Sequence, residues 1–142
     1  MKVTIAAALA LVFVVSPILA NGKHDPLPAS VMSAKTVYID NQTGHSEITD
    51  RATEALNKWG RFKSLTVATD ADLVLRFTAD TKGRPTPPHN DIDISPTPVT
   101  LSVVDQANTV LWFVSKNEPF HSQTRLEINE LKKRIEEQEK GK

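Results

Sequence analysis

Apolar residues recur along this chain at the spacing typical of strands in some stretches and of helices in others. These stretches predict short secondary-structure elements. In 35–40, Val37 and Ile39 lie on one face and Tyr38 on the other, which predicts a strand ended by Asn-Gln-Thr-Gly. The other strand-like stretches are 62–68, 73–78, 99–104 and 109–114. Asp105 to Asn108 suit a tight turn, so the last two are expected to form an antiparallel hairpin.

Two other stretches repeat apolar residues at the helical period. The first begins at Ser46, which offers an N-cap oxygen, and Gly60 is placed to end it. Its stripe consists of Ile48, Ala52, Ala55, Leu56 and Trp59. The second runs from about 122 to 140, with a stripe of Thr124, Ile128, Leu131 and Ile135. Its apolar seam covers only about one heptad, so docking on its own sheet is preferred to a dimeric coil.

The order of these elements predicts an α+β fold in one domain, spanning 35–140. Strand, helix, four strands and helix (β-α-β-β-β-β-α) give a four- or five-stranded mixed sheet with two amphipathic helices packed on one face. The other face of the sheet is left partly open. A proline-rich loop at 79–98 interrupts the strands, because five of the nine prolines lie there.

The N-terminal residues have the pattern of a secretory signal peptide. Lys2 precedes an apolar run, and small residues lead to a cleavage position after Ala20. We therefore expect a signal peptide at 1–20 and a flexible leader at 21–34 with Gly22 and two prolines. An uncleaved membrane anchor is the alternative, and Pro17 and the short apolar core argue against it.

The amino-acid composition limits the cellular locations and the partners that we expect for the protein. There is no cysteine, so neither disulfides nor lipid attachment at a cysteine can form, and a periplasmic or secreted bacterial protein without a stable membrane anchor is expected. The 17 basic residues balance 17 acidic ones. Such a surface gives no electrostatic attraction toward nucleic acid or an anionic membrane.

The sequence offers no familiar enzymatic motif. There is no Gly-x-Ser-x-Gly or Ser-x-x-Lys motif and no glycine-rich phosphate loop, so no catalytic, cofactor-binding or metal-binding residue is assigned. The alternative is a metal-dependent hydrolase using His89, Asp91 and Asp93 in the proline-rich loop, whose alternate spacing suits a divalent ion. The paired carboxylates Asp70 and Asp72 are interpreted as turn residues.

Two surfaces are candidates for interaction with an envelope protein or with a second copy. If Leu111 and Phe113 point away from the helices, they form an exposed apolar patch on the sheet, while Trp112 between them packs in the core. The second candidate is Pro85, Pro87 and Pro88, which match a Pro-x-x-Pro ligand pattern.

Several short segments resemble a family of small exported bacterial proteins of unknown function. They are 37–44, 58–62, 70–75, 103–105, 111–112 and 131–140. In topology the chain is also similar to the TolB amino-terminal domain and to the curli-secretion and penicillin-binding-protein-activator lipoproteins. Those domains work through protein contacts, so the resemblance implies a non-catalytic interaction role.

Overall fold

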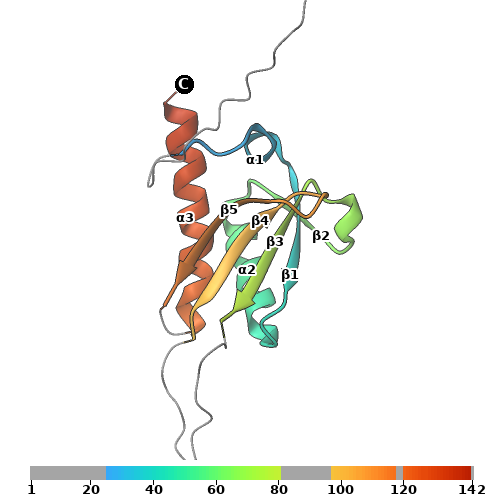
Figure 1. The fold of residues 1–142 in the computed structure, drawn as a ribbon, viewed down its shortest axis with the longest axis vertical. Coiled ribbons are helices and arrows are strands. Elements are labelled where there is room, and N and C mark those ends of the chain that lie inside the picture. Colours follow the sequence, from blue (N-terminus) through green and yellow to red (C-terminus); the bar gives the residue numbers. More distant parts are fainter. Residues whose placement is uncertain (1–24, 81–96, 118–119, 142) are drawn as a thin grey trace, which may run out of the picture.

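The computed structural model describes residues 25–80, 97–117 and 120–141 and contains a β-sheet with helices packed against it (Figure 1). In chain order the elements are α1 (Ala29–Ser33), β1 (Thr36–Asn41), α2 (Ser46–Trp59), β2 (Lys63–Leu65), the 3₁₀ turn η2 (Ala68–Asp70), β3 (Leu73–Ala79), β4 (Val99–Val104), β5 (Val110–Lys116) and α3 (Phe120–Lys140). Figure 1 shows α2 and α3 together on one side of the sheet.

The five strands form one mixed sheet in the order β2-β1-β3-β4-β5. β1 runs parallel to both β2 and β3, whereas β4 is antiparallel to β3 and to β5. The predicted α+β class, the mixed sheet and the β4–β5 hairpin are therefore confirmed. The helix α1 is an addition to the predicted pair.

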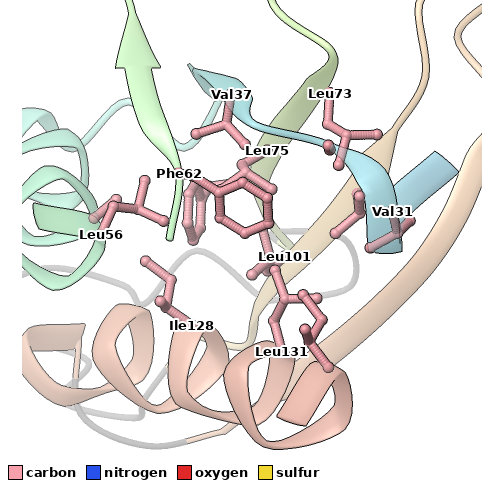
Figure 2. Close-up of a cluster of buried hydrophobic side chains, with 14 of the residues drawn as sticks. Val31, Val37, Leu56, Phe62, Leu73, Leu75, Leu101, Ile128 and Leu131 are labelled. Carbon is pink, nitrogen blue, oxygen red and sulfur yellow. The ribbon is translucent and has the colours of Figure 1, made fainter. Parts of the chain in front are cut away.

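Alternate residues of the central strands build the core on the helical side. Leu73, Leu75 and Phe77 of β3 lie beside buried residues of β1 and β4. Figure 2 shows Leu56 of α2 and Ile128 of α3 converging on this layer. The predicted stripe of α3, which consists of Thr124, Ile128, Leu131 and Ile135, is buried throughout. Removal of this apolar surface from water is what joins the helices to the sheet.

The segment at 21–34 differs from the expected flexible leader over the part that the structure describes. It contains α1, and Leu27, Val31 and Ala34 are buried in the core. A helix of five residues has no stability of its own, so packing of Val31 against the core holds it. Such a helix leaves no periodic pattern in the sequence.

The ends of several other elements also differ from the predicted bounds. β2 covers 63–65 where the sequence predicts a strand over 62–68, and Phe62, just before β2, is buried in the core and 5% exposed. α2 ends as predicted at Gly60, which has φ 76° and donates its N–H to the Leu56 carbonyl at 2.9 Å. At its other end Ser46 is already helical, and His45 holds the N-cap position with no side-chain cap.

The two ends of the predicted proline-rich loop lie side by side where the neighbouring strands β3 and β4 end and begin. The Asp80 N–H donates to the Pro98 carbonyl at 3.0 Å, which continues the pairing of β3 and β4. Residues 81–96, like the expected signal peptide, lie outside the described residues. In the described ranges, no helix has both the length and the apolar content needed to cross a bilayer.

Candidate interaction surface on the open sheet face

The sheet face opposite the helices is a network of mutually bonded polar side chains. Arg76 Nε donates to Asp40 Oδ2 at 2.8 Å, and Arg76 Nη1 donates to Asn108 Oδ1 at 2.9 Å. Gln42 Nε2 donates to the same Asp40 oxygen at 2.9 Å. Because these groups bind one another, they form a fixed polar surface suited to recognition.

Phe113 stands at the free end of this polar row. The register places Asp40 beside Arg76, Arg76 beside Ser102 and Ser102 beside Phe113. The Phe113 side chain is 65% exposed, and Val110 on the same strand is 53% exposed. An aromatic ring this exposed next to bonded polar groups is typical of an interface anchor.

A β-bulge separates the two residues that the sequence grouped into one patch. The pairing of β4 with β5 shifts at Val103 and Val104, so Val104 faces Val110 and Val103 faces Trp112. The extra residue, Leu111, is partly buried and packs against the core together with Trp112. A bulge resets the alternation of a strand, so Phe113 lies on the open face while Leu111 does not.

The strand that carries Phe113 is an edge of the sheet. β5 has seven residues, of which only Lys116 is charged, and among the described strands it pairs with β4 alone. The opposite edge, β2, has three residues and starts with exposed Lys63. An edge strand that is short and carries an exposed lysine is protected from the addition of another strand. Of the two edges, β5 is therefore the one open to another strand.

The β4–β5 turn holds this edge in place. Asn108 adopts the left-handed conformation with φ 64°, and its N–H donates to the Asp105 carbonyl at 3.0 Å. Gln106 Nε2 donates to the carbonyls of Ala68 at 2.8 Å and Ala71 at 2.5 Å. These bonds fix the hairpin to the segment before β3, so the edge is presented in one orientation.

Sequence reasoning missed a buried carboxylate on α3. Glu127 is fully buried, and neither of its carboxylate oxygens has a hydrogen-bond partner among the described residues. Burial raises the pKa of Glu127 to about 8, and the backbone and charge of nearby Lys116 oppose this only in part. The signal was its position three residues after Thr124 and four before Leu131, on the stripe itself.

The remaining candidate residues fall into two groups. Pro85, Pro87 and Pro88, and the proposed metal ligands His89, Asp91 and Asp93, lie outside the described residues. Within the described ranges no three His, Asp or Glu side chains are grouped as a metal site would require. Asp72 has a structural contact: its Oδ2 accepts the N–H of Lys35 at 2.8 Å and of Thr36 at 3.0 Å, which lowers its pKa.

Comparison with known proteins gives a structural likeness and no match in sequence. No protein-family model matches the chain, and no curated protein matches it. Among solved structures, the chain is similar to a PelC dodecamer from Paraburkholderia phytofirmans, with 15% sequence identity and a TM-score of 0.45. The match covers 80% of this chain and 94% of that one.

Proposed function

We propose that this protein is an exported interaction domain of the bacterial envelope, which binds another envelope protein or a second copy of itself through the β5 edge. The observation that carries the proposal is Phe113, 65% exposed on an edge strand. Strand addition to such an edge supplies affinity through main-chain hydrogen bonds, and exposed side chains supply specificity. The similarity in topology, inferred from the sequence, to envelope domains that work through protein contacts favours the same role.

The experiment places a photo-crosslinking amino acid at position 113 in the cell that naturally produces the protein. We expect one discrete adduct, whose mass distinguishes a second copy from a different envelope protein. The matched control carries the same crosslinker at position 63, on the short opposite edge, where no adduct of that mass is expected.

The variant Phe113→Asp tests the role of the aromatic ring itself. Because Phe113 is mostly exposed, the substitution leaves the circular dichroism spectrum and the melting temperature nearly unchanged, within about 0.5 kcal/mol of stability. It is expected to abolish the adduct formed from a second crosslinker at position 115. An adduct of equal yield in the Phe113→Asp chain contradicts binding at this edge.

A further inference from the structure

A second concave surface lies between α2 and α3, away from the open sheet face. It is a groove of about 690 Å³ to which both helices contribute side chains. Exposed Leu126 and partly buried Trp59 line it, and buried Ile128 closes its floor. The Trp59 ring meets the Phe62 ring edge-on, with 5.1 Å between centroids, which holds the indole in one orientation. The groove therefore offers a preformed apolar floor.

The rim of this groove is strongly basic although the whole chain is neutral. Among the described residues, four cationic side chains line it, Arg51 and Lys58 from α2 and Arg125 and Lys132 from α3, against one carboxylate, that of Glu54. Over the full sequence 17 basic residues balance 17 acidic ones. Among the described residues, positive charge is therefore in excess around this groove, where it attracts an anionic ligand.

Among the described residues, the ion pairs on the rim of the groove are long and exposed. Arg51 and Lys132 each have a carboxylate one turn away at 3.9 Å, with all four side chains at least 40% exposed, a geometry that contributes little. Lys58 and Arg125 form no ion pair within the part of the chain that the structure describes. An external carboxylate could therefore bind Lys58 and Arg125 without breaking an ion pair among the described residues.

The spacing of the cations indicates the size of the ligand. On each helix the two basic residues are seven positions apart, which corresponds to about 10.5 Å along the axis at 1.5 Å per residue. Carboxylates at i and i+7 of a helical peptide have the same separation. An apolar side chain between them would reach Leu126 and Trp59.

We infer that the groove between α2 and α3 binds an acidic peptide segment of a partner protein, with carboxylates about 10.5 Å apart on either side of an apolar residue. This inference extends the proposed interaction role to a second surface. A concave site between two helices suits a peptide better than the flat surface of an anionic membrane.

The test uses the full chain carrying Trp112→Phe, so that Trp59 is the single fluorescent indole of the two tryptophans. The probe is a synthetic helical peptide with Glu at i and i+7 and Leu between them, and the matched peptide has Gln at both positions. We expect the Glu peptide to shift Trp59 emission and to bind at least about fivefold more tightly than the Gln peptide. Equal affinity for the two peptides would overturn the inference.

Two charge-reversal variants distinguish binding in the groove from an effect of the protein's overall charge. Arg125→Glu is expected to weaken Glu-peptide binding about fivefold, whereas Lys63→Glu, the same charge change outside the groove, leaves it unchanged. Equal effects of both variants, or binding of phosphatidylglycerol vesicles in place of the peptide, would overturn it. Such a failure leaves the crosslink at position 113 untouched, so the two proposals fail independently.

Discussion

At the residue scale, the buried carboxyl group of Glu127 makes stability depend on pH. Its carboxylate is fully buried on α3, and its pKa is raised to about 8 from an ordinary value of 4.5. The folded protein therefore keeps a proton that the unfolded chain releases above pH 4.5. Stability is expected to fall as pH rises from 4.5 to 8 and to change little beyond, because both states are then ionised.

Glu127→Gln removes this titration and should flatten the pH dependence. We expect the free energy of unfolding at pH 9 to increase by roughly 2–4 kcal/mol relative to the parent chain, with a smaller difference at pH 5. Urea unfolding at the two pH values measures it. Glu130→Gln, on the same helix, is the control and is expected to leave the pH dependence unchanged. A parent chain that gains stability between pH 5 and pH 8 would contradict this account of Glu127.

At the element scale, the end of α2 depends on one glycine. Gly60 has φ 76°, where a side chain is strained, but a Cβ there would meet no atom within 4 Å. Gly60→Ala should therefore destabilise the protein by about 1–2 kcal/mol through backbone strain alone.

Thermal unfolding measures this cost against Gly141→Ala at the end of α3. Gly141 has no positive φ and only an ordinary contact of 3.4 Å from its added Cβ, so its substitution should be nearly neutral. Equal melting temperatures for the two variants would show that the left-handed cap contributes nothing.

Elements with a local pattern were predictable, and elements that depend on distant contacts were not. β4 matches its predicted bounds of 99–104 because its apolar and polar residues alternate strictly up to Val103. The face of the sheet on which Leu111 and Phe113 lie could not be predicted from such an alternation. Three consecutive apolar residues, 111–113, are compatible with either face, and only pairing with β4 reveals the bulge.

The same reasoning explains what the sequence missed in the candidate surfaces. The groove between α2 and α3 depends on how two helices pack, so the cations of the two separate helices could not be assigned to one site. The partial burial of Leu111 follows from the bulge in the pairing of β5 with β4, which no local pattern encodes. Glu127 lay on a predicted apolar stripe and was assigned to neither the core nor the surface.

At the scale of the whole molecule, the two ends of the described chain are joined by a side-chain clamp. Gln138 Oε1 accepts the Leu27 N–H at 2.6 Å, and Gln138 Nε2 donates to the Leu27 carbonyl at 3.1 Å. Arg134 Nη2 adds a bond to the Asp25 carbonyl at 2.6 Å. The first described segment is thereby fixed along the C-terminal half of α3.

Gln138→Ala should release this segment. Loss of both hydrogen bonds is expected to cost about 1–2 kcal/mol of global stability. Hydrogen exchange followed by mass spectrometry should show faster exchange in 25–33, with Glu137→Ala, at the exposed neighbouring position, as the control. Unchanged exchange in that segment would mean that burial of Val31 alone holds α1.

The clamp also has a consequence for the order in which the protein folds. Leu27 and Gln138 are 111 positions apart, so their contact is among the most distant in sequence. A chain is synthesised from its N-terminus, and a contact that closes so long a loop forms late. Leu27 leaves the ribosome early yet gains this partner only when the final turns of α3 have emerged. Until this contact forms, the segment around Leu27 is not fixed to α3. The domain is therefore most exposed to proteases between the synthesis of Leu27 and the completion of α3.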